Sequence, residues 1–321
     1  MTKRRSHSRS ARGPIRSRSL FGALAGALAL GALGGCAGAA SGDIEGSTSG
    51  PPYEEPTTVL TASLDGIAER RSGAALIDTA HCDEGYAAAS AVGRNRLKLQ
   101  VSCGQMSYNY DLPQDGTPIV VPMNMGDGSY ELSVLENASG AIYAEVISQS
   151  AAVSLESEFA PYLRPNVFCR YTADSQCVTK ARELAEHAVN QGDVVRAIYR
   201  WMMDAISYDD EKAQELSGTS GYVPDPDATL QSGSGICFDY ASLAAAMFRS
   251  LGIPCQIVTG NVAPEDVYHA WNLIYIDGEW ASALITVGPD QWTRIDLTFA
   301  ASEGDDYLRR DDASYTERYR Y

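Results

Sequence analysis

The clearest chemical feature of the chain is a cysteine at the start of an apolar, helix-forming run within Gly233–Pro254. Two glycines closely precede Cys237, and Gly252 and Pro254 end the apolar run. This pattern predicts a glycine-rich loop followed by a helix. A thiol in the first helical turn faces the positive end of the helix dipole and unpaired backbone N–H groups, which favour the thiolate. The sequence therefore predicts that Cys237 is a nucleophile.

A nucleophilic cysteine needs a base, and a histidine is the usual one. Beyond the first 35 residues the chain contains three histidines. His81 lies next to a cysteine in a strand-rich stretch. His187 lies among acidic residues on a predicted amphipathic helix, where a solvent-exposed role is expected. His269 begins a predicted strand after the cysteine helix, so it is the natural partner of Cys237.

Several short motifs around these two residues resemble the core of the transglutaminase-like superfamily. The resemblance is close from Gly233 to Thr298, and the preceding helices extend it to about Cys169. It implies a papain-related α+β domain in which the cysteine begins a helix and the histidine and aspartate lie on successive strands. The motifs are Gly235-Ile236-Cys237-Phe238-Asp239-Tyr240-Ala241, Arg249-Ser250-Leu251-Gly252-Ile253-Pro254, Tyr268-His269-Ala270-Trp271-Asn272, Asp277-Gly278-Glu279-Trp280 and Asp296-Leu297-Thr298.

The resemblance implies a role for each matched residue. Cys237 matches the nucleophile, His269 the general base and then acid, and Asp296 the residue that orients the histidine. The backbone N–H of Cys237 would be one oxyanion donor. Tyr222 is a candidate for the second donor, and packing of its ring is an equally good interpretation.

Two departures from the family pattern bear on the aspartate. Leu297 stands where the family commonly has proline, and the segment between the histidine and the aspartate contains an additional hairpin with two tryptophans. Asp277 and Asp290 compete with Asp296, but both lie in turn signals, where aspartate is expected for turn formation.

Thiol acyl transfer through such a triad leaves the acceptor open, because the groove and not the triad selects it. Water as acceptor makes a protease or amidase, which is the function we expect, and an amine makes a protein-crosslinking transglutaminase. A surface-binding module that keeps the fold without catalysis is a further alternative. We expect no cofactor and no metal, since no calcium-loop or clustered-ligand pattern is present.

The elements that must position these residues follow from periodicity. Apolar spacing predicts helices over Val178–Asn190 and Asp193–Ser207, with Asp193 as N-cap, and a cysteine helix to Leu251 that buries one stripe of its surface. Period-two patterns then predict antiparallel strands. Their bounds are Cys255–Gly260, His269–Ile276, Glu279–Thr286, Gln291–Thr298 and a closing strand over Tyr315–Tyr321.

A strand-rich stretch precedes these helices and predicts a separate all-β module. Short strands separated by turn residues indicate an Ig-like antiparallel sandwich over residues 69–160, with the transglutaminase-like domain over 161–321. The expected function of the sandwich is spacing. Its clearest strands are Asn95–Ser102, Met106–Leu112, Thr117–Asn124, Ser129–Glu136 and Ala141–Leu155.

The N-terminal segment predicts export. Seven basic residues precede a short apolar run from Leu20 to Leu33, and Leu33-Gly34-Gly35-Cys36 resembles a bacterial lipobox. We therefore expect a signal peptide over residues 1–35, lipid on Cys36 and a flexible tether over 36–68. This layout resembles that of bacterial surface lipoproteins held on the outer face of the cytoplasmic membrane.

Removal of that segment makes the chain strongly acidic. The full sequence has 25 Lys and Arg against 41 Asp and Glu; without the seven basic residues, 25 − 7 = 18 remain and the net charge falls from −16 to −23. Such a charge argues against a nucleic-acid partner. The expected partners are a protein or peptide substrate at the cell surface and, through the lipid, the membrane.

The remaining cysteines are expected to be structural. Cys255 lies in a predicted strand and is expected to be a small core residue. Proximity in the sequence pairs Cys82 with Cys103 and Cys169 with Cys177 as disulfides, although four cysteines allow three connectivities.

Overall fold

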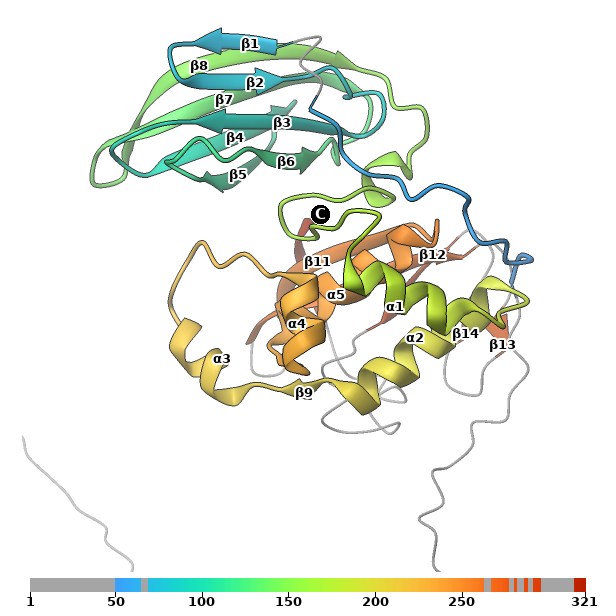
Figure 1. Ribbon diagram of the computed structural model, residues 1–321. Coiled ribbons are helices and arrows are strands. Elements are labelled where there is room, and N and C mark those ends of the chain that lie inside the picture. Colours follow the sequence, from blue (N-terminus) through green and yellow to red (C-terminus); the bar gives the residue numbers. More distant parts are fainter. Residues whose placement is uncertain are drawn as a thin grey trace, which may run out of the picture. The chain divides into compact units, whose positions relative to one another are not determined.

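A computed structural model describes residues 50–64, 69–262, 267–276, 280–281, 286–287, 291–295 and 315–321 (Figure 1). Cys36 and Asp296 lie outside the described residues. Within the described part, no helix is both long enough and apolar enough to cross a membrane.

The N-terminal half is a sandwich of two four-stranded antiparallel sheets, with strand orders β1-β2-β3-β6 and β5-β4-β7-β8. Along β4, alternate residues Leu97, Leu99 and Val101 are buried and join one core with residues of the opposite sheet. The predicted all-β module is thus confirmed. Its strands are β1 Glu69–Ser72, β2 Ala75–Asp78, β3 Tyr86–Ala91, β4 Leu97–Cys103, β5 Met106–Leu112, β6 Ile119–Pro122, β7 Gly128–Ser139 and β8 Ile142–Val153.

The C-terminal half combines helices with a third antiparallel sheet of order β15-β12-β11-β16. A short 3₁₀ helix, η1 (Ala160–Tyr162), follows the sandwich. The helices are α1 Gln176–Ala185, α2 Gln191–Ala205, α3 Asp210–Leu216, α4 Pro226–Ser232 and α5 Cys237–Ser250. The strands are β9 Ser207–Tyr208, β10 Ser234–Gly235, β11 Cys255–Val262, β12 Val267–Ile276, β13 Trp280–Ala281, β14 Thr286–Val287, β15 Gln291–Ile295 and β16 Tyr315–Arg320.

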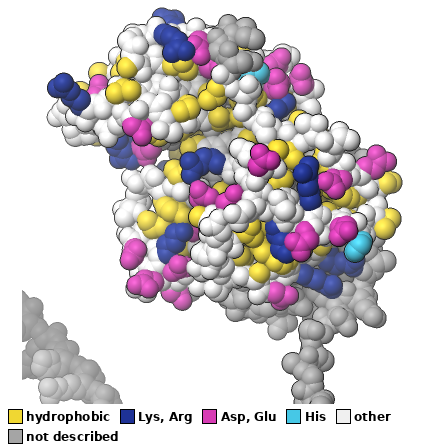
Figure 2. Space-filling view, viewed as in Figure 1, with side chains coloured by type: hydrophobic (Ala, Val, Ile, Leu, Met, Phe, Trp, Pro, Cys, Tyr) yellow, Lys and Arg dark blue, Asp and Glu magenta, His cyan; other side chains and the backbone are white. Residues whose placement is uncertain are grey.

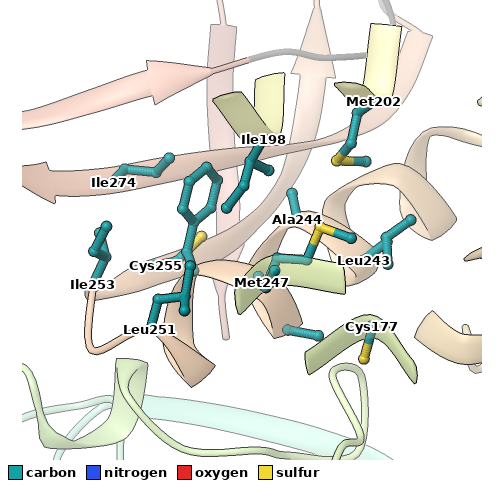
Figure 3. Packing of buried hydrophobic residues seen from close by; sticks show 14 of the residues in the cluster. Cys177, Ile198, Met202, Leu243, Ala244, Met247, Leu251, Ile253, Cys255 and Ile274 are labelled. Atoms are coloured by element: carbon teal, nitrogen blue, oxygen red, sulfur yellow. The ribbon is translucent and has the colours of Figure 1, made fainter. Parts of the chain in front are cut away.

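Helix α5 forms the centre of this half. Every residue from Asp239 to Ser250 is buried, so the predicted single apolar stripe was too narrow. The helix contacts α1, α2 and α4 as well as β11 and β12, and these neighbours cover its whole circumference. Figure 3 shows Leu243, Ala244 and Met247 among side chains from α2 and the sheet. Alanine and serine at positions 241, 242, 244–246 and 250 let these neighbours approach closely.

A buried arginine fixes the far end of α5. Arg249 is 1% exposed and donates three hydrogen bonds to backbone carbonyls: Nε to Cys255 (2.9 Å), Nη1 to Arg164 (2.8 Å) and Nη2 to Tyr321 (2.8 Å). These carbonyls belong to β11, to the segment after the sandwich and to the residue after β16. One side chain therefore ties the end of the helix to three distant stretches of chain.

The start of α2 differs from its prediction. Asn190, and not Asp193, is the N-cap: its side chain accepts from the Asp193 backbone N–H (3.0 Å), while Asp193 Oδ2 accepts from the Asn190 N–H (3.3 Å). Asp193 is thus the third helical residue of a reciprocal capping box. The prediction was three residues late because glycine at position 192 looked like a break before the helix.

Residues 50–64, expected within the flexible tether, lie against the protein. The Tyr53 N–H donates to the Val189 carbonyl (2.9 Å) and the Gln191 N–H to the Pro51 carbonyl (3.0 Å). Val59 is 6% exposed and belongs to the core around α5. Tyr53 and Val59 thus anchor a segment whose proline- and glutamate-rich composition indicated only flexibility.

The four cysteines expected in disulfides are free thiols. Cys82, Cys169 and Cys177 are buried, and Cys103 is half-buried. Cys82 lies in the turn before β3, and Cys103 ends β4 in the opposite sheet. Burial raises the pKa of the Cys82 thiol to about 12 and that of Cys169 to about 11, which keeps both thiols protonated.

Acidic and basic side chains are interspersed over the face of the molecule shown in Figure 2. Alternation of this kind keeps single-sign fields on that face small.

Candidate active site

Cys237 is the first residue of α5, as its sequence context predicted. Helix α4 ends at Gly233, whose φ of 64° is a left-handed conformation that favours glycine. Strand β10 then pairs in parallel with β9, with Gly235 opposite Tyr208. Ile236 caps the helix, so the N–H of Cys237 belongs to the first turn, where no preceding helical carbonyl is available to it.

A buried carboxylate organises this turn. Asp239 is fully buried, and its Oδ2 accepts from the Ile236 N–H (2.9 Å) and from Lys212 Nζ (2.6 Å). Its Oδ1 accepts from the Tyr222 hydroxyl. The Lys212 ammonium also lies 4.8 Å from the centre of the Tyr222 ring. Asp239 thereby connects α5 to α3 and to the segment before α4.

The pKa shifts agree with this network. Burial is the largest single effect on Lys212 and lowers its pKa, but the hydrogen bonds to Asp239 and Tyr222 and the attraction of both groups together outweigh it, so the pKa is raised. Burial, and next the bond to Asp239, raise the pKa of Tyr222 to about 12. At neutral pH the lysine is therefore charged and the tyrosine hydroxyl is a donor, which keeps the buried carboxylate compensated.

Gly235 is required by the same arrangement. A Cβ added at this position would lie 2.6 Å from the Asp239 Cβ, closer than real Cβ contacts come. Any larger residue would push the capping carboxylate away from the turn that carries Cys237.

The topology places His269 at the same end of the structure as Cys237. β11 follows α5 through a short turn and is antiparallel to β12, so α5 and β12 run in the same direction. Asn272 Nδ2 donates to the Ala241 carbonyl (3.0 Å) and fixes the two elements side by side. Cys237 lies four residues before Ala241, about 6 Å toward the start of the helix. His269 lies three residues before Asn272, about 10 Å toward the start of the strand.

His269 itself is 5% exposed. It is three residues from Asn272, so strand alternation places its side chain on the face of β12 opposite the one that contacts α5, where its ring stacks at 6.4 Å on the Trp271 ring. Asp296, the predicted third member, lies outside the described residues. β15, which ends one residue before it, pairs with β12 and sets Ile295 opposite Asn272.

Comparisons with known proteins match this part of the chain. A family model described as the transglutaminase-like superfamily matches residues 178–283, the stretch from α1 to just beyond β13. The chain carries a transglutaminase-like domain.

Two curated relatives are kyphoscoliosis peptidases. That of Mus musculus is 32% identical over 108 residues, which cover 30% of this chain and 16% of the relative. That of Homo sapiens is 27% identical over 143 residues, which cover 41% and 21%. The chain therefore matches only about a sixth to a fifth of these relatives' length.

Among solved structures, the "Putative Cysteine Protease from Cytophaga hutchinsonii" is 16% identical, with a TM-score of 0.33 over 80% of this chain and 81% of that one.

The other histidines of the described residues lie away from this site. His81 belongs to the sandwich, where Nδ1 contacts Glu84 (2.8 Å) and the ring stacks on Tyr86. His187 is exposed beyond the end of α1. Within the part of the chain that the structure describes, no cluster of His, Cys, Asp or Glu is arranged to hold a metal ion.

The site of the transglutaminase-like domain contains a tyrosine that the sequence did not single out. Tyr208 is opposite Gly235 in the β9–β10 pair, is 39% exposed and lies close enough to Cys237 for a thiolate there to raise the tyrosine pKa, after the larger effect of burial. The predicted candidate Tyr222 instead donates its hydroxyl to Asp239. A two-residue strand carries no periodic signal, so only the fold reveals the position of Tyr208.

Gly235→Ala tests whether the cap holds Cys237. We expect the added methyl to displace Asp239, to lower the free energy of unfolding by about 1–3 kcal/mol and to slow alkylation of Cys237 by iodoacetamide. Urea unfolding and peptide mass spectrometry give the two readouts. Gly140→Ala, at a φ of 55° with open space around it, is the control that adds backbone strain far from Cys237. Wild-type alkylation in Gly235→Ala would contradict this role of the cap.

Proposed function

We propose that this protein is a thiol hydrolase of peptide or amide bonds, with Cys237 as nucleophile and His269 as general base and acid. The observation that carries the proposal is the position of Cys237 as the first residue of α5, in a turn capped by the buried Asp239 carboxylate. The Asn272–Ala241 contact adds that the backbones at the start of α5 and the start of β12 lie at one end of the domain. The name of the kyphoscoliosis peptidases supports hydrolysis over crosslinking.

The first half of the reaction is acylation. His269 takes the thiol proton and the Cys237 sulfur attacks the amide carbonyl carbon. The carbonyl electrons move to oxygen, and the resulting oxyanion accepts a hydrogen bond from the Cys237 backbone N–H. When the carbon–nitrogen bond breaks, His269 returns the proton to the leaving amine, and a thioester remains on Cys237.

The second half is hydrolysis. His269 takes a proton from water and the hydroxide oxygen attacks the thioester carbonyl; the carbon–sulfur bond then breaks, the carboxylic acid forms, and His269 returns the proton to the Cys237 sulfur. An amine in place of water would give a crosslink by the same steps. Asp296 would orient the imidazole throughout.

Cys237 and His269 are tested together by thiol reactivity. We expect iodoacetamide to alkylate Cys237 faster than the buried thiols at neutral pH, and His269→Ala to lower that rate and to shift its pH profile upward, because the base is lost. His187→Ala, an exposed histidine, is the matched control. Peptide mapping assigns the label to each cysteine. Equal rates in wild type and His269→Ala would count against an activated thiol.

A substrate experiment then separates the acceptors. Peptides and surface proteins incubated with wild type and with Cys237→Ala should show cleavage only with wild type, also when an excess of a small amine is present. Amine incorporation in preference to cleavage would establish the crosslinking alternative. No product with either acceptor would favour a binding module.

Tyr208 is the side chain that we propose as the second oxyanion donor. It flanks Cys237 and is partly exposed, so its hydroxyl is available to a bound substrate, whereas the Tyr222 hydroxyl is engaged. We expect Tyr208→Phe to lower kcat about 100-fold while the iodoacetamide rate stays at the wild-type value, because alkylation forms no oxyanion. A Tyr208→Phe enzyme with wild-type kcat would exclude this role. Tyr222→Phe, which we expect to slow alkylation as well, is the comparison.

We also propose that the protein is exported and anchored through lipid on Cys36. The support is the sequence pattern of the first 36 residues. In a bacterial host, the full chain should incorporate labelled palmitate and partition into a detergent phase, and Cys36→Ser should lose both properties. Retained label in Cys36→Ser would place the lipid elsewhere.

A further inference from the structure

One segment contacts both the β-sandwich and the catalytic turn. Residues 217–225, here called the bridge loop, connect α3 to α4 and contain no regular structure. On the sandwich, Arg96 forms a bidentate pair with Asp111, Nε to Oδ1 at 2.9 Å and Nη2 to Oδ2 at 2.8 Å. The same Nη2 donates to Ser220 Oγ in the bridge loop (3.3 Å).

The next residues of the bridge loop fit closely against the same pair. Gly221 has a φ of 90°, and a Cβ there would lie 2.9 Å from Asp111 Oδ2, so only glycine allows this approach. Val223 packs against the apolar core of the sandwich. The bridge loop is therefore docked on the sandwich on both sides of residue 222.

Tyr222, between these two contacts, reaches in the other direction. Its hydroxyl donates to Asp239 Oδ1, and its ring lies under the Lys212 ammonium, which also binds Asp239. Helix α3, which precedes the bridge loop, has no buried residue. The docked contacts and the bonds of Lys212 and Tyr222 to Asp239 therefore order this stretch together, because little burial offsets its conformational entropy.

We propose that the β-sandwich is a positioning element of the catalytic site. Arg96 and Asp111 hold the bridge loop, the loop holds the Tyr222 hydroxyl, and that hydroxyl holds the carboxylate that caps the turn of Cys237. This assigns the sandwich a role beyond spacing. This proposal rests on the proposed function only where it concerns catalytic rate. The reactivity of the Cys237 thiol reports on the structure of the first turn of α5 without any substrate.

The test is a double-mutant cycle on the full chain, with the second-order rate of Cys237 alkylation by iodoacetamide as readout. Tyr222→Phe removes the hydroxyl and keeps the ring, and we expect a rate about tenfold lower, from the loss of a hydrogen bond to a charged group. Arg96→Ala should lower the rate several-fold. If both act through the bridge loop, the double variant should react about as slowly as Tyr222→Phe alone.

The pH profile distinguishes positioning from general destabilisation. With fewer donors on Asp239, the negative charge near the thiol is less compensated and disfavours the thiolate, so the pH profile of the alkylation rate should move to higher pH in both variants. Arg71→Ala is the matched control, since Arg71 also pairs with a carboxylate, that of Glu69, on the sandwich surface. It should leave the rate and the pH profile unchanged. Urea midpoints show that each variant is folded at assay conditions, and Asp111→Asn repeats the test without removing side-chain volume.

The outcomes are separable. Wild-type reactivity in both Arg96→Ala and Asp111→Asn, or independent multiplication of the Arg96→Ala and Tyr222→Phe effects, would overturn the proposal even if His269→Ala confirmed an activated thiol. Conversely, slowed alkylation in Arg96→Ala and Tyr222→Phe, with no effect of His269→Ala, would support the positioning role while the proposed catalysis failed.

Discussion

The buried carboxylate of Asp239 is the interaction on which the catalytic turn depends. A charge out of contact with water is costly unless donors replace the water, and each donor lost from a buried acceptor costs about 1–3 kcal/mol. Here the donors come from three places: the Ile236 backbone, Lys212 in α3 and Tyr222 in the bridge loop. The buried charge therefore requires these three segments to come together at Asp239, two residues after Cys237.

The two ends of α5 are held by opposite charges. Asp239 lies in the first turn, where the helix dipole favours an anion, and Arg249 lies in the last turn, where it favours a cation. Both side chains are buried, so each must find its partners on other segments. The apolar middle of the helix is covered by α1, α2, α4 and the sheet, and the charged ends set its position along its own axis. A shift of one residue would break both sets of bonds.

Local patterns predicted most of the fold. β-Branched and aromatic alternation located β4 to β8, and glycine and proline located the ends of α5, because those signals act within a few residues. The N-cap of α2 was misplaced, and the disulfides were not found. The anchoring of residues 50–64 was also missed. Each of these depends on which distant segments meet, and composition does not encode that.

The candidate site was predicted unevenly for the same reason. Cys237 at a helix start could be inferred from its own loop, and the position of His269 from the strand after it. The role of Tyr222 could not be inferred from the sequence. Tyr222 lies in a loop without periodicity, and its hydroxyl donates to Asp239, 17 positions further along the chain. Tyr208 went unnoticed because β9 and β10 are two residues each and form only with one another. The environment of Asp296 remains a prediction.

The stretch that resembles known proteins is smaller than the unit that holds the site together. The family match covers residues 178–283 and includes Cys237, Asp239 and His269. Yet Arg249 binds the carbonyls of Arg164 and Tyr321, which lie on either side of that stretch. On the sandwich, Tyr108 stacks edge-on against Tyr319 and Tyr321 of the closing segment. The far end of α5 is thus fixed from outside the matched region, and its first turn is tied to the sandwich through the bridge loop. Loosening the sandwich should therefore loosen the catalytic turn before it unfolds the core around α5.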